Sequence, residues 1–258
     1  MHIETVGQGP HLVLVHGWSM HSVVWRDLIP MLATDFTLHL VDLPGHGKSE
    51  WQAGDFELDS LLETLHQQLP EQVAFLGWSL GGLLGLLFSQ RYRQQVTRLS
   101  LLAATPCFVQ KADWSSAMAA DVFNQFASQL SDNQNDALQR FLLLQARGSY
   151  HSRETIRILA QQMAIAQSPN SEALAAGLAV LINADGRQQL TEIMCPIQLI
   201  LGQRDNLIPQ TVLAAVKQLN PGVNTHLITG AGHAPFISHP TECYQRIHSF
   251  LTATANND

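Results

Sequence analysis

The chain has 258 residues, of which 46% are hydrophobic and 14% are charged. This composition excludes a disordered chain and fits one globular domain with an insertion. The formal net charge of −7 argues against non-specific binding of nucleic acid, which needs a basic surface. The three cysteines, Cys107, Cys195 and Cys243, are odd in number and scattered, so they show neither a disulfide framework nor metal-ligand spacing.

The N-terminal sequence lacks a basic region followed by an apolar core, and no apolar run approaches the roughly 18 residues that a membrane span needs. We therefore expect a cytoplasmic protein that does not bind membranes. Nothing in the sequence points to a cofactor or a metal ion, and we expect a monomer.

Strand-like and helix-like segments alternate along the first part of the chain. Apolar runs predict strands at 3–6, 12–15, 36–41, 73–76 and 96–102, and helical patterns cover 58–69 and 80–88. Further strands are predicted at 197–201 and 225–228. This repeated β-α-β order predicts an α/β protein with a mainly parallel sheet.

Between residues 109 and 184 the pattern changes to helical spacing without strands. Polar breaks fall at 131–136, 148–152 and 168–171. We interpret residues 109–184 as an inserted helical cap, and residues 1–108 and 185–258 as the core that carries it.

The strongest single motif is Gly-Trp-Ser-Leu-Gly at residues 77–81. A buried strand that turns sharply into a helix strains the backbone at its apex and leaves no room for side chains two positions away, which glycine at 77 and 81 satisfies. The Ser79 hydroxyl is then held beside a helix N-terminus, where negative charge is favoured. The motif predicts a nucleophile, although alone it also fits a glycine-rich turn with an incidental serine.

Two later strands end in loops that carry candidate partners for Ser79. Asp205 follows the predicted strand 197–201, and His233 follows the predicted strand 225–228 within Gly-Ala-Gly-His-Ala. Both loops should lie at the sheet edge that holds Ser79, so His233 could act as general base while Asp205 orients its ring. Taken singly, His233 could be structural and Asp205 could cap a turn.

Gly-Trp-Ser-Leu-Gly-Gly, then Gly-x-x-Asp-x-x-x-Pro at 202–209 and Gly-x-Gly-His at 230–233, resemble the α/β-hydrolase superfamily in its order Ser, acid, His. The resemblance spans nearly the whole chain. It implies the α/β-hydrolase fold, with a mostly parallel central sheet flanked by helices and an inserted helical cap.

Four stretches, 12–18, 36–45, 75–83 and 233–240, further resemble the pimeloyl-[acyl-carrier-protein] methyl ester esterases of biotin synthesis. That resemblance implies a serine carboxylesterase that forms an acyl-enzyme at Ser79. It also implies an acyl-carrier protein as partner, with small esters as substrates in vitro.

The resemblance places the oxyanion hole at the backbone N–H groups of Leu80 and Trp18. The Trp18 and Trp78 side chains fit a pocket wall or core packing equally well. His16 should order its loop rather than bind metal, because no neighbouring residues complete a zinc ligand set.

The cap should select the substrate. The resemblance implies that residues 141–145 contact the acyl chain, and apolar side chains at helical spacing fit either that wall or ordinary core. The members of this segment are Phe141, Leu142, Leu143, Leu144 and Gln145.

Four arginines, Arg140, Arg147, Arg153 and Arg157, stand in a stretch of the cap that contains a single acidic residue, Glu154. Arg153 and Arg157 are spaced to share a helix face, which suits phosphopantetheine or an acidic carrier-protein helix. A solvated basic face is the alternative.

Other functions stay open at the sequence level. A general short-chain carboxylesterase or a carbon–carbon bond hydrolase of this fold would use the same three residues, and a binding module without turnover would keep the pocket. A dehalogenase is disfavoured because it needs a carboxylate where Ser79 stands.

Overall fold

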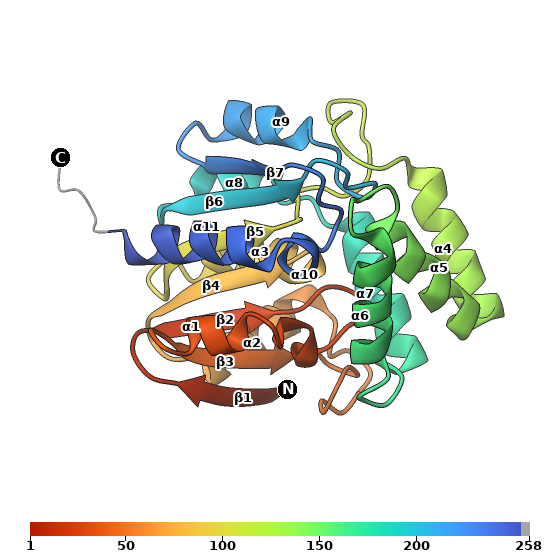
Figure 1. Cartoon of the computed structure of the whole chain (residues 1–258), viewed down its shortest axis with the longest axis horizontal. Helices are drawn as coiled ribbons and strands as arrows, with labels where there is room; N and C mark the ends of the chain where they lie inside the picture. Colours follow the sequence, from red (N-terminus) through yellow and green to blue (C-terminus); the bar gives the residue numbers. More distant parts are fainter. Residues whose placement is uncertain (254–258) are drawn as a thin grey trace.

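A computed structural model describes residues 1–253 of the chain. Its centre is a seven-stranded sheet in the order β1-β3-β2-β4-β5-β6-β7 (Figure 1). Only the edge pair β1–β3 is antiparallel; the other neighbours run parallel, as predicted. The strands are β1 (His2–Gly7), β2 (His11–Val15), β3 (Thr37–Asp42), β4 (Val73–Trp78), β5 (Val96–Leu102), β6 (Ile197–Gly202) and β7 (Asn224–Ile228).

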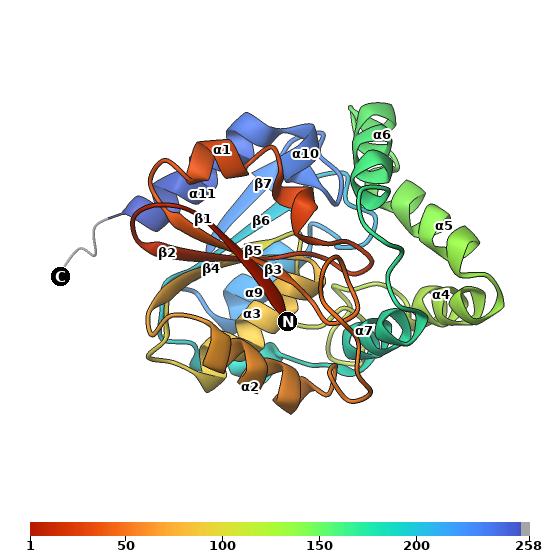
Figure 2. The same cartoon turned by 90° about the horizontal axis from the view of Figure 1, so that it is seen from below.

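Helices cover both faces of the sheet (Figure 2). One face is covered by α2 (Leu58–Gln68), α3 (Leu80–Arg91), α8 (Arg187–Glu192) and α9 (Val212–Leu219). The other carries the 3₁₀ helix η1 (Ser22–Trp25) with α1 (Ile29–Leu32), α10 (Pro235–Ser238) and α11 (Pro240–Thr252). The sequence pattern predicts α2 and α3 but not the other helices of these two layers.

Alternation along the strands divides the apolar side chains between two cores. Val13 and Phe75 belong to the core beneath α2 and α3, whereas Leu14 and Leu76 belong to the core on the opposite face. Successive strand residues point to opposite faces, so a strand that is apolar throughout contributes to both cores. This explains why the strands read as continuous apolar runs.

Four helices between β5 and β6 lie beyond the carboxyl ends of the strands (Figures 1 and 2). They are α4 (Ala120–Asp132), α5 (Gln134–Ala146), α6 (Ser152–Met163) and α7 (Ser171–Asn183). The predicted break at 131–136 was too long, because only Asn133 separates α4 from α5. The Asn133 side chain accepts hydrogen bonds from the amides of Asn135 and Asp136, so α5 begins at once.

Residues 109–118, before α4, contain two isolated β-bridges, Val109 to Met118 and Lys111 to Trp114.

No helix within residues 1–253 has both the length and the apolar character needed to cross a membrane.

Candidate active site

Ser79 occupies the turn between β4 and α3 in a strained conformation, with φ 55° and ψ −115°. The two flanking glycines make this turn possible. A Cβ atom at Gly77 would lie 2.2 Å from the Gly81 carbonyl oxygen, and one at Gly81 would lie 2.2 Å from the Val15 carbonyl oxygen. The Ser79 amide donates to the Leu102 carbonyl at 3.0 Å, which holds the turn against β5. The turn therefore has room only for glycine at positions 77 and 81, as the motif predicts.

A continuous hydrogen-bond chain joins Ser79, His233 and Asp205. The Ser79 hydroxyl lies 2.9 Å from Nε2 of His233, and Nδ1 of His233 lies 2.8 Å from Oδ2 of Asp205. The side chains of Asp205 and His233 are 0% and 1% exposed. This order of carboxylate, imidazole and hydroxyl matches the arrangement that makes serine a nucleophile.

The Asp205 carboxylate has two roles in the structure. Its Oδ1 accepts the backbone amides of Leu207 at 2.8 Å and Ile208 at 3.0 Å, while Oδ2 faces His233. The turn-capping alternative is therefore also true, because one oxygen caps the turn and leaves the other for the histidine.

Trp78 and Gln145 hold the His233 loop from two sides. The Trp78 indole N–H donates to the His233 carbonyl at 2.8 Å, and the His233 amide donates to the Gln145 carbonyl at 2.9 Å. A Cβ atom at Gly232 would lie 2.8 Å from that same Gln145 oxygen. The sequence predicts Trp78 only as a wall or core residue and Gln145 only as an acyl-chain contact, and no local signal predicts these contacts.

The loop after β2 brings Trp18 close to Ser79. A Cβ atom at Gly17 would lie 3.3 Å from the Ser79 Cβ, so the two turns are in contact. Among residues 1–253, neither the Trp18 nor the Leu80 backbone N–H has a hydrogen-bond acceptor. Free amide donors beside a nucleophile are what a developing oxyanion requires.

The Trp18 side chain packs against the cap helices. Its indole N–H donates to the Leu174 carbonyl at 2.8 Å, and its ring meets Phe141 edge to face, with centroids 4.8 Å apart. The side chain is 1% exposed. Trp18 therefore links the β2 loop to α5 and α7 through its side chain while its backbone N–H stays available.

His16 orders the loop that precedes Trp18. The Leu43 amide donates to its Nε2 at 3.0 Å, so its proton is on Nδ1, which donates to the Gly17 carbonyl at 2.8 Å. Burial, with a smaller contribution from His46, lowers the pKa of His16 to about 3. The described residues contain no group of three or more His, Cys, Asp or Glu side chains that could hold a metal ion.

The predicted acyl-chain segment divides into buried and exposed residues. Phe141, Leu142 and Gln145 are buried and Leu144 is half-buried, but Leu143 is 52% exposed. Leu143 is exposed on α5, and its part in an apolar wall stays a prediction. The Gln145 carboxamide is buried, and within residues 1–253 neither its nitrogen nor its oxygen has a partner.

All four cap arginines are exposed to solvent. Arg157 approaches Glu154 at 3.9 Å and donates to Gln161 at 3.2 Å. Arg140, Arg147 and Arg153 make no ion pair with any residue in the described part of the chain. The predicted basic stretch is thus a solvent-facing surface on α5, α6 and the turn between them.

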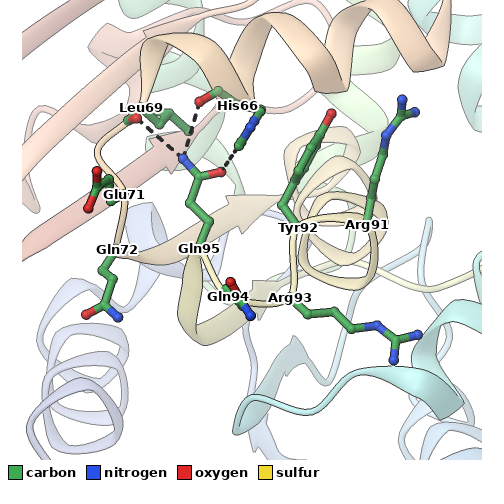
Figure 3. Close-up of a pocket in the computed structure, with 9 residues that line it drawn as sticks. All are labelled: His66, Leu69, Glu71, Gln72, Arg91, Tyr92, Arg93, Gln94 and Gln95. Carbon is green, nitrogen blue, oxygen red and sulfur yellow. Dashed lines mark hydrogen bonds between the residues drawn. The ribbon is translucent and has the colours of Figure 1, made fainter.

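A separate cavity of about 650 Å³ lies at the opposite edge of the sheet, before β4 and β5 (Figure 3). The Gln95 side chain closes its floor: its nitrogen donates to the carbonyls of His66, Leu69 and Pro70, and its oxygen accepts from Nδ1 of His66 at 2.7 Å. None of the residues that line this cavity belongs to the Ser79 site, so the two are separate.

Residues 10–240 match the family model described as the alpha/beta hydrolase fold. The chain belongs to the α/β-hydrolase family. The bromoperoxidase from Bacillus anthracis, at TM-score 0.88, and the esterase from Exiguobacterium antarcticum, at 0.87, share this fold. Each is 20% identical to the chain, and each comparison covers 97% of this chain and 95% of the other.

Among its relatives, the chain is 40% identical over 253 residues to the pimeloyl-[acyl-carrier protein] methyl ester esterase of Xylella fastidiosa strain M12, with 97% of this chain and 98% of the relative covered. It is 38% identical over 253 residues to the protein of the same name from Xanthomonas campestris pv. campestris strain B100, covering 98% and 99%.

Proposed function

We propose that the protein is a serine carboxylesterase in which Ser79, His233 and Asp205 form the catalytic triad. The observation that carries this proposal is the unbroken hydrogen-bond chain from the buried Asp205 carboxylate through His233 to the Ser79 hydroxyl. His233 accepts the Ser79 proton at Nε2 as the hydroxyl oxygen attacks the ester carbonyl carbon. Asp205 keeps the other ring proton on Nδ1 and stabilises the imidazolium.

The tetrahedral intermediate places its negative charge near the unpaired amides of Leu80 and Trp18. Leu80 begins α3, so its N–H belongs to the positive end of that helix. The intermediate collapses as His233 returns its proton to the departing alcohol. Water, deprotonated by His233, then hydrolyses the acyl-enzyme and restores Ser79. This sequence of steps needs no metal ion or organic cofactor.

The substrate we propose is the methyl ester of a pimeloyl group carried on acyl-carrier protein, in biotin synthesis. Support comes from relatives of that name, 38–40% identical over nearly the full chain. Ser79 attacks the methyl ester, methanol leaves, and the free carboxylate stays attached to the carrier. We also propose that the protein is a cytoplasmic monomer. One chain supplies the whole triad, so the reaction needs no second subunit.

We assign residues 109–184 the role of a substrate-selecting cap. Phe141, Leu142 and Leu144 would contact the acyl chain, and the buried Gln145 carboxamide would bind a polar group of it. Leu143, although exposed on α5, belongs to the same proposed segment.

Arg140, Arg147, Arg153 and Arg157 would hold the carrier at the cap surface. A carrier held there, with its distal ester at Ser79, would keep the thioester outside the reactive geometry.

Product analysis on pimeloyl-carrier methyl ester tests the proposal. We expect methanol and a carrier that still bears its acyl chain through an intact thioester. Release of the free carrier thiol would contradict the proposed placement. Turnover of short esters but not of the carrier-bound ester would leave a general carboxylesterase. Cleavage of a ring-opened diketone, with neither ester cleaved, would identify a carbon–carbon hydrolase.

A further inference from the structure

Three hydrogen bonds connect the turn between α5 and α6 to the loops that carry Asp205 and His233. We call residues 145–150 the junction segment. Its Gln145 carbonyl accepts the His233 amide at 2.9 Å, and its Tyr150 amide donates to the Gly230 carbonyl at 3.0 Å. Its Arg147 carbonyl accepts from Nδ2 of Asn206 at 2.5 Å. The cap is therefore bonded directly to both catalytic loops.

The Tyr150 side chain adds a fourth contact to this connection. Although Tyr150 is 64% exposed, one edge of its ring lies against Gly230, where a Cβ atom would be only 2.2 Å from the ring. The Arg204 guanidinium lies 5.4 Å from the centre of the same ring. A cation at this distance from an aromatic ring is attracted to it, so Tyr150 is held between the two loops.

The core partners of the junction segment are close neighbours of the catalytic pair in sequence. Arg204 and Asn206 flank Asp205 directly, and Gly230 stands three residues before His233. A displacement of the junction segment would therefore move the carboxylate and the imidazole relative to Ser79. Catalysis is sensitive to such movement, because a misplacement of about 1 Å can lower the rate by roughly 10².

We propose that the junction segment positions the His233–Asp205 pair, with Asn206 and Tyr150 as positioning residues. The proposal rests on the triad proposed above. Asn206 acts through its bond to the Arg147 carbonyl, and Tyr150 acts through the face of its ring. Neither side chain hydrogen-bonds to Ser79, His233 or Asp205, so their effect on the reaction is indirect.

The test compares Asn206→Ala and Tyr150→Ala with wild type on a short p-nitrophenyl ester. The rate is divided by the concentration of active sites titrated with a serine-directed phosphonate, which removes any loss of folded protein. We expect kcat per titrated site to fall about threefold to tenfold in each variant, with KM changed less than about twofold. Asn206→Ala removes the side-chain bonds to the Arg147 and Arg204 carbonyls, and Tyr150→Ala removes the ring contacts with Gly230 and Arg204. Tyr150→Phe, which keeps the ring, should restore kcat.

Asn183→Ala is the matched control, because the exposed Asn183 side chain also donates to a backbone carbonyl, that of Ala179 on α7. Equal kcat per titrated site in Asn206→Ala, Tyr150→Ala and Asn183→Ala would overturn the proposal. Failure of the phosphonate to label wild-type Ser79 would instead refute the triad.

A second pair of variants tests the contact between the Tyr150 ring and Gly230 directly. Gly230→Ala should lower kcat per titrated site by about tenfold or more, because the new methyl group collides with the ring as well as straining φ at 77°. In a Gly230→Ala, Tyr150→Ala double variant only the strain remains, so Gly230→Ala should cost less there than in wild type. Strictly additive losses would contradict the role of the ring.

Discussion

Replacing Asp205 with asparagine should nearly abolish turnover while leaving the fold intact. The side-chain oxygen of the new amide can still accept the backbone N–H groups of Leu207 and Ile208, which bond to Oδ1 in the wild type. The NH₂ group of that amide then faces Nδ1 of His233, where the carboxylate Oδ2 lay at 2.8 Å. Donation to Nδ1 forces the ring proton onto Nε2, so His233 cannot accept the Ser79 proton.

The expected loss in kcat is roughly 10⁴-fold, the size found when a triad carboxylate becomes an amide that stabilises the wrong tautomer. Asp205→Ala serves as the contrast, because it also leaves the two buried turn amides without an acceptor. At about 1.5–3 kcal/mol for each bond to a charged group, that variant should lose about 3–6 kcal/mol of unfolding free energy. Asp205→Asn should lose much less.

Two measurements check this reasoning: kcat on a short p-nitrophenyl ester, and the free energy of unfolding in urea. Asp205→Asn with kcat within about tenfold of wild type would refute the tautomer argument. Asp205→Ala as stable as Asp205→Asn would refute the claim that Oδ1 holds the turn.

Gly77→Ala should lose roughly 3 kcal/mol or more of unfolding free energy in urea, because its Cβ would lie 2.2 Å from the Gly81 oxygen. Unchanged stability would contradict the close approach of residues 77 and 81 in the turn at Ser79. Burial lowers the pKa of His46 from 6.5 to about 4. Between these pH values His46 is protonated in the unfolded chain but not in the folded one, so the free energy of unfolding should fall as pH drops from 6.5 towards 4. His46→Asn, measured by thermal unfolding, should flatten that fall, and an identical pH dependence would exclude His46 as a cause. Reversal of Arg153 and Arg157 to glutamate should lower kcat/KM for the carrier-bound ester by about tenfold or more and spare short esters; unchanged activity on both would refute carrier docking there.

The parts of this protein that the sequence predicts are those with local causes. The central strands β2 and β4 are visible because side chains buried on both faces must be apolar. All of β2 to β7 lie within two residues of the predicted ranges. The turn at Ser79 is visible because its strained backbone demands Gly77 and Gly81. The order of Asp205 and His233 at strand ends places them at one edge of a parallel sheet.

The parts that the sequence does not predict depend on contacts between distant residues. Trp78 and His233 are 155 positions apart, and nothing local to either indicates that an indole N–H holds the histidine carbonyl. In the cap, helical spacing indicates that α5 has an apolar side but not which of its leucines are buried: Leu142 is, and Leu143 is exposed. The sequence predicts a break at 131–136 because the single capping residue Asn133 stands among other polar residues that belong to α4 and α5.

The proposed function depends above all on Ser79 as the nucleophile for a carrier-bound methyl ester. The most direct measurement follows methanol release from pimeloyl-carrier methyl ester by wild type and by Ser79→Ala, prepared side by side. We expect release by wild type and none above background by Ser79→Ala. Equal release by the two proteins would contradict the proposed function, and so would the absence of release by wild type.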